Sequence, residues 1–271
     1  MPNRLIVCIA LLAGATASLN AADSLFVLRA NGLIEHVDFD TLEIVESVQT
    51  EATFGPAEMV IGSDGAFYIS NFYSIQRFDP ISAQTEVVVT GLNVPNPRAA
   101  VFNYVDFDER GDLIFGMTGI FSNNQSRTRA FSLDLDADDA IATEHFQFQI
   151  PTPNVFDVMI QDSESLLAAD YQNGRVMLVD RQTGAAEEFA TGLDSIVSLF
   201  ELEGDVYALS QFGDLHTIDL ATGATEYHGF LPGSNHDFIG SAVASGVSLP
   251  APSAAMVGML VLGFSARRRR V

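Results

Sequence analysis

Short apolar stretches recur along the chain, and turns rich in Asp, Gly and Asn separate them. In the clearest copy, residues 58–70, Met59-Val60-Ile61 precedes a Gly-Ser-Asp-Gly turn and a second apolar stretch. That second stretch returns at intervals of 41, 46, 53 and 40 residues, with anchors at Phe26, Phe67, Leu113, Leu166 and Val206. Short apolar runs bounded by turn residues predict β-strands.

Two more strands complete each repeat. After each anchor comes a strand that is expected to end in an aspartate, and a fourth strand follows; the aspartates are Asp40, Asp79, Asp134, Asp180 and Asp219. Four short strands in roughly 40 residues are typical of one blade of a β-propeller. We therefore predict an all-β fold, a β-propeller of about five four-stranded blades over residues 23–246. A β-sandwich remains the alternative, although a sandwich does not require this recurrence.

The two ends of the repeat array complement each other. The first copy lacks a first strand, and residues 238–245 have the pattern of a lone first strand. We expect this C-terminal strand to pair beside residues 26–29 in the N-terminal blade, which closes the ring and removes the exposed sheet edges. Six blades stay open as an alternative if the two longest intervals contain further strands.

The N-terminal residues 1–22 have a different pattern and predict a secretory signal peptide. Arg4 precedes an apolar run over residues 5–12, and Ala15-Thr16-Ala17 or Asn20-Ala21-Ala22 fits the cleavage rule. A buried N-terminal strand is the alternative. Because Cys8 is the only cysteine, its removal would leave the mature chain without a disulfide or a cysteine nucleophile.

Residues 247–271 form the third predicted part. Pro250-Ala251-Pro252 precedes an apolar segment, and the chain ends with Arg267, Arg268, Arg269, Arg270 and Val271. This order resembles the PEP-CTERM sorting signals of bacteria that use an exosortase. The resemblance implies an exosortase as processing partner, transient membrane anchoring through the apolar segment, and delivery to the cell envelope, the cell surface or an extracellular polymer matrix.

Two points about this tail stay open. Ala251 departs from the Pro-Glu-Pro of the family, which leaves the cleavage point undefined. An ordinary C-terminal membrane anchor is the alternative to a sorting signal, and the positive-inside rule would then keep the arginines in the cytoplasm and the propeller outside.

Charge narrows the possible partners. The formal net charge is −22, lysine is absent, and all 35 acidic residues lie within the predicted propeller. Such a chain repels nucleic acid, whose binding needs a basic surface. A high net charge favours disorder only when few residues are hydrophobic. Because 48% of this chain is hydrophobic, we expect it to fold despite its charge. The acidic residues indicate either a solvated surface that keeps the protein soluble or sites for divalent cations.

Candidate metal ligands come from polar residues near the start of each predicted first strand, because these strands line the central channel. The positions are Glu58, Asn96 or Asn103, Asn154, Asp194 and Asp237. Oxygen ligands from several blades would suit Ca²⁺. We take Asn103, Asn154, Asp194 and Asp237 as the tentative metal set.

Two segments are similar to the repeats of NHL or SMP-30/gluconolactonase propellers: residues 103–116, and Pro153-Asn154 ahead of the strand at Leu166. In that family such asparagines help to hold a metal that polarises a lactone carbonyl. The resemblance implies the same metal-binding role for Asn103 and Asn154. The spacing of Asp194 departs from the family, and the family's glutamate has no secure counterpart.

The sequence thus predicts an exported, exosortase-sorted propeller with a non-catalytic binding or structural role. The alternative is a calcium-dependent lactonase or hydrolase that acts at the channel. No catalytic residue is predicted.

Overall fold

A computed structural model describes residues 23–51, 56–90, 100–108, 110–120, 126–137, 141–150, 155–232 and 237–245. The predicted signal peptide, the predicted sorting tail, Asn96 and Asn154 lie outside the described residues. Within them, no helix is long and apolar enough to cross a membrane. The described chain is almost entirely β-structure, and a short 3-10 helix covers Tyr171–Asn173.

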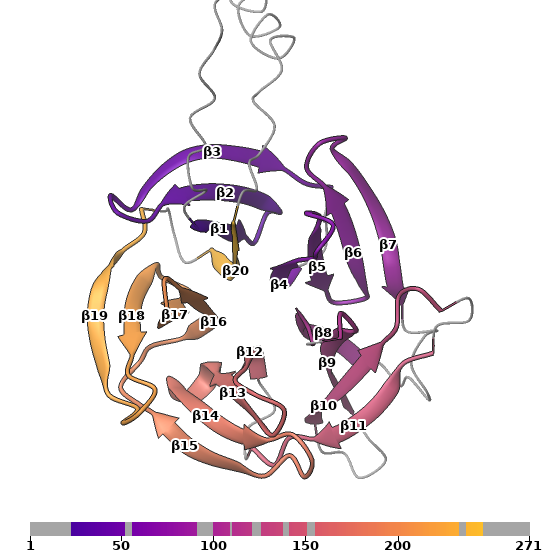
Figure 1. The fold of residues 1–271 in the computed structure, drawn as a ribbon, viewed down its shortest axis with the longest axis vertical. Helices are drawn as coiled ribbons and strands as arrows, with labels where there is room; N and C mark the ends of the chain where they lie inside the picture. The colour runs from indigo at the N-terminus through magenta and orange to yellow at the C-terminus, as the bar shows by residue number, and fades with distance from the viewer. Residues whose placement is uncertain are drawn as a thin grey trace, which may run out of the picture.

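Five antiparallel sheets of four strands surround a common axis (Figure 1). From the axis outward, blade 1 contains β20 (Phe238–Ser245), β1 (Asp23–Arg29), β2 (Leu33–Asp38) and β3 (Glu43–Gln49). Blade 2 contains β4 (Pro56–Ile61), β5 (Phe67–Asn71), β6 (Ser74–Asp79) and β7 (Gln84–Thr90). The remaining blades repeat this order.

Blade 3 contains β8 (Ala100–Phe107), β9 (Leu113–Ile120), β10 (Ser126–Leu133) and β11 (Thr143–Gln147). Blade 4 contains β12 (Val155–Ile160), β13 (Ser165–Asp170), β14 (Arg175–Asp180) and β15 (Ala186–Ala190). Blade 5 contains β16 (Ile196–Leu202), β17 (Asp205–Ser210), β18 (Asp214–Ile218) and β19 (Thr225–Phe230). The predicted all-β propeller of five four-stranded blades is confirmed. Blade 3 is longer than the others partly because three of its strands, β8, β9 and β10, have eight residues each.

The ring closes as the sequence predicts, because β20 pairs with β1 from Asp23↔Ser245 to Arg29↔Phe238. Arg29 strengthens this closure. Its guanidinium contacts Glu35 at 2.6 Å and Asp237 at 2.7 Å, and it lies 3.8 Å from the centre of the Phe238 ring. The same side chain donates to the carbonyl of Pro232. Arg29 therefore joins the two ends of the described chain through three contacts, with Asp237, Phe238 and Pro232, while Glu35 holds its guanidinium from within blade 1.

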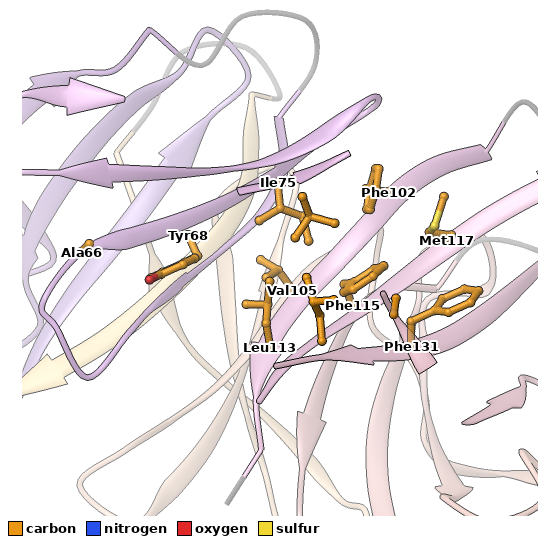
Figure 2. Packing of buried hydrophobic residues seen from close by; sticks show 12 residues of the cluster. Ala66, Tyr68, Ile75, Phe102, Val105, Leu113, Phe115, Met117 and Phe131 are labelled. Atoms are coloured by element: carbon orange, nitrogen blue, oxygen red, sulfur yellow. The ribbon is translucent and has the colours of Figure 1, made fainter. Parts of the chain in front are cut away.

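Apolar side chains fill the spaces between adjacent blades. Figure 2 shows the contact of blades 2 and 3, where Tyr68 and Ile75 face Val105, Leu113 and Phe115. All five residues of β5 are buried, whereas in the outer strand β7 Val89 is the one buried residue and the others are exposed or partly buried. Inner strands are packed on both faces, which explains why their sequences are near-continuous apolar runs.

The aspartates at the ends of the third strands close the turns that lead to the fourth strands. Backbone N–H groups donate to the side chains of Asp79, Asp134, Asp180 and Asp219. The prediction for blade 1 was wrong by two residues, because β2 ends at Asp38. The Thr41 N–H donates to Asp38, which makes Asp38 the residue that caps this turn. Aspartate suits the position since its short side chain accepts from backbone groups two or three residues on.

Candidate functional site

The innermost strands are irregular near their starts. Each of β4, β8, β12, β16 and β20 has a register shift against its neighbour within the first residues of the strand. An extra residue of this kind bends the strand and changes the direction of nearby side chains. Four polar residues from four different blades lie within or next to these shifts: Glu58, Asp157, Ser198 and Ser241.

Glu58 and Asp157 form a buried carboxyl pair. Their exposed fractions are 1% and 4%. The Glu58 Oε1 atom accepts hydrogen bonds from the N–H groups of Met59 at 2.8 Å and Ser241 at 3.1 Å. The Asp157 Oδ2 atom accepts from the N–H of Leu199 at 2.6 Å. Each carboxyl group is therefore held by a backbone donor from a neighbouring blade.

Ser198 lies between the two carboxyl groups. Its Oγ atom is 3.1 Å from Asp157 Oδ2, 3.4 Å from Glu58 Oε1 and 2.8 Å from Ser241 Oγ. Both serines are buried. The two carboxyls and two hydroxyls thus form one network, which we call the axial cluster: Glu58, Asp157, Ser198 and Ser241.

The surroundings favour the neutral form of these acids. Burial raises the pKa of Glu58 well above its usual value, and the nearby charge of Asp157 raises it further. Burial also raises the pKa of Asp157 to about 8, although the Leu199 N–H opposes this shift. The pKa of Asp106 on β8 is raised to about 7, again chiefly by burial. At neutral pH the acids near the axis therefore retain protons that exposed carboxyls would have lost.

A small cavity of about 190 Å³ adjoins the axial cluster. The acidic residues Asp106, Asp157 and Glu201 are among those that line it, and most other lining residues are apolar, such as Met159 and Phe200. Pockets for drug-sized ligands have volumes of about 300–1,000 Å³. The cavity is therefore too small for such a ligand.

The predicted metal ligands lie in different surroundings. The amide nitrogen of Asn103 donates to Thr118 Oγ1 and to the carbonyl of Val155, within the contact between blades 3 and 4. Asp194 is exposed and accepts from the Ser195 hydroxyl. Asp237 is paired with Arg29.

In the part of the chain that the structure describes, no hydrogen bond joins any two of Asn103, Asp194 and Asp237. The same part contains no group of three or more His, Cys, Asp or Glu side chains arranged to hold a metal. Because Asn154 lies outside the described residues, the full predicted metal set stays a prediction.

Sequence reasoning named Glu58 as a channel residue but missed Asp157, Ser198 and Ser241. A signal for Asp157 was present, since Asp157-Val158-Met159-Ile160 has the same acidic-then-apolar pattern as Glu58-Met59-Val60-Ile61. The serines carry no comparable signal, because hydroxyl residues are common in strands and turns throughout the chain.

Comparisons with known proteins identify the fold. No protein-family profile matches the chain, and no curated protein matches it. Among solved structures, a chain in a nidogen/laminin complex is 13% identical with a TM-score of 0.53, and the match covers 82% of this chain and 98% of that chain. Identity this low shows the propeller fold alone.

Two further structures are similar at lower scores. A protein of unknown function from Bacteroides caccae is 11% identical with a TM-score of 0.49, covering 76% of this chain and 73% of that one. An inactive variant of virginiamycin B lyase from Staphylococcus aureus is 14% identical with a TM-score of 0.45, covering 80% and 73%.

Proposed function

We propose that the protein is exported and sorted by an exosortase to the cell surface or extracellular matrix, where the propeller has a non-catalytic binding or structural role. The N-terminal residues 1–22 and the C-terminal residues 247–271 support export and sorting through their sequence patterns. The acidic composition supports a soluble extracellular domain, because a large net charge keeps protein molecules apart.

The burial of the axial cluster is the main support for a non-catalytic role of the propeller. Glu58 and Asp157 are 1% and 4% exposed, and backbone N–H groups of adjacent blades already bind one oxygen of each. A general acid or base must come within about 3 Å of the proton it transfers. The cavity beside Asp157 is too small for a drug-sized ligand, and this supports a role of these carboxyls in holding the ring together.

The sorting proposal predicts a defect when the arginine cluster is removed. Replacing Arg267, Arg268, Arg269 and Arg270 with alanine should leave an unprocessed chain in the membrane fraction, because the tail would lose the charges that hold its end in the cytoplasm. Immunoblots of membrane, surface and medium fractions from the native host measure this. A second variant, Pro250→Ala with Pro252→Ala, keeps the charges and should block processing alone. Unchanged size and location in both variants would contradict the proposal.

Melting experiments distinguish the proposed function from the alternative, a calcium-dependent lactonase. Our proposal predicts the same melting temperature in millimolar calcium as in EDTA once ionic strength is matched with magnesium. A site-bound calcium at 100 times its Kd would instead add about 2.7 kcal/mol to the free energy of unfolding. Asp194→Asn is the test variant for a bound calcium. Because Asp194 is exposed, removing its carboxylate should not affect folding. A calcium-specific shift that this variant abolishes would favour the alternative.

A further inference from the structure

One oxygen in the axial cluster has no hydrogen-bond partner. The Glu58 Oε2 atom is buried and unpaired among the described residues, whereas Oε1 accepts from two N–H groups. An ionised carboxylate divides its charge between both oxygens, and a buried charge without a donor is strongly unfavourable. A neutral carboxylic acid avoids this cost, because the unpaired oxygen then carries the proton.

The charged and titratable neighbours reinforce the neutral state. From β12, Asp157 faces Glu58 and raises its pKa. From β8, Asp106 raises the pKa of Asp157, and both aspartates raise that of the buried Tyr104. The strands β16 and β20 contribute the hydroxyls of Ser198 and Ser241, which carry no charge. Arg181 acts on Asp106 and lowers its pKa.

These contacts connect four of the five blades. Glu58 on β4 reaches Ser241 on β20, and Asp157 on β12 reaches Ser198 and Leu199 on β16. Ser198 and Ser241 then join the two halves at 2.8 Å. If both carboxyls were ionised, two negative charges would face each other across Ser198 in a buried site, which is the arrangement that makes paired carboxylates share a proton.

We propose that a proton held by Glu58 and Asp157 locks blades 1, 2, 4 and 5 together at the axis, and that its loss in alkaline solution loosens the ring. This lock is independent of where the protein is exported. It makes the propeller a sensor of the pH of its surroundings, with the proton as the ligand.

The direction of the pH effect follows from linkage. An unfolded aspartate has a pKa of about 3.9, whereas that of Asp157 in the ring is about 8. Between these values the folded state holds a proton that the unfolded state releases, so stability falls as pH rises through this range. Exposed carboxyls have the opposite effect on stability, at acidic pH. Backbone N–H groups lower the pKa of Asp162 and Asp180, so the stability that these two residues contribute is lost as the solution becomes acidic.

The test is a titration of the full chain with ¹³C-labelled carboxyl groups, followed by NMR from pH 4 to pH 10, together with melting temperatures over the same range. We expect the carboxyl resonances of Glu58, Asp157 and Asp106 to titrate far above the others, and a melting temperature that falls from weakly acidic to alkaline pH. Asp157→Asn should remove one of these resonances, change the titration of the other two, and flatten the fall in melting temperature.

Glu43→Gln is the matched control, because Glu43 is an exposed acid on β3; it should leave both the resonances and the slope unchanged. If Asp157→Asn does not fold, the resonances of the unsubstituted protein decide the question alone. The proposal is overturned if every carboxyl titrates near its usual value, or if Asp157→Asn keeps the slope of the unsubstituted protein.

Discussion

Replacing Arg29 with alanine should lower the free energy of unfolding by about 3–5 kcal/mol, the cost of removing one partner from a buried ion pair. Arg29 is 4% exposed and Glu35 is 7% exposed. Without the guanidinium, the buried Glu35 carboxyl would lose the donor it has now. The variant would also lose the contacts to Asp237 and to the Phe238 ring, which connect β1 to the start of β20.

Urea unfolding followed by circular dichroism measures this loss. Arg29→Lys is the conservative variant: it keeps the charge but lacks the planar fork that binds two carboxylates, and its stability should lie between those of the alanine variant and the natural protein. Arg77→Ala is the surface control, since the Arg77 pairs with Asp64 and Glu86 are partly exposed and such pairs contribute about 0–1 kcal/mol. Equal losses for Arg29→Ala and Arg77→Ala would contradict a special role of Arg29 in ring closure.

Gly223→Ala should lower the free energy of unfolding by about 2–5 kcal/mol, because two costs combine at this position. Gly223 has φ of 69°, and a left-handed conformation costs a residue with a Cβ about 1–2 kcal/mol. A Cβ at Gly223 would also overlap the carbonyl oxygen of Phe189 in the preceding blade, and forced overlap in a packed region costs about 1–3 kcal/mol. The turn of blade 5 and the outer strand of blade 4 would have to separate.

Gly65→Ala is the control for the first cost alone. Gly65 has φ of 75°, and a Cβ there meets nothing within 4 Å. We expect Gly65→Ala to lose only the stability that the left-handed backbone conformation costs. The difference in unfolding free energy between the two variants then measures the cost of the overlap between blades. Equal unfolding free energies for the two variants would show that the turn moves away from Phe189 without cost.

Much of the architecture could be predicted from the repeat. An apolar run such as that of β5 forms an inner strand because both of its faces are covered, and the aspartate that follows a strand such as β6 closes the next turn. The interval between anchors is the length of one blade, which is why five blades followed from five anchors. The missing first strand of blade 1 predicted the pairing of β20 with β1, since an unpaired inner strand would leave backbone groups without partners.

The candidate site was less predictable, and the reason is geometric. Glu58 was named because it precedes a strand, but Asp157 and Ser198 meet it only through the bulges of β12 and β16. A bulge changes which face a side chain occupies, and no residue type in these strands indicates one. Asp194 and Asp237 also precede inner strands, yet one is exposed and the other pairs with Arg29.

Local sequence pattern was therefore sufficient for most strands and turns and for ring closure, and it favoured the correct blade number. Each of these depends on periodicity and on the need to satisfy backbone hydrogen bonds along the chain. The burial of particular acids at the axis depends on tertiary packing. It brings together strands more than 100 residues apart in sequence, such as those of Glu58 and Ser198. Burial and neighbouring charge set the protonation of Glu58 and Asp157, and both arise only when the ring is assembled.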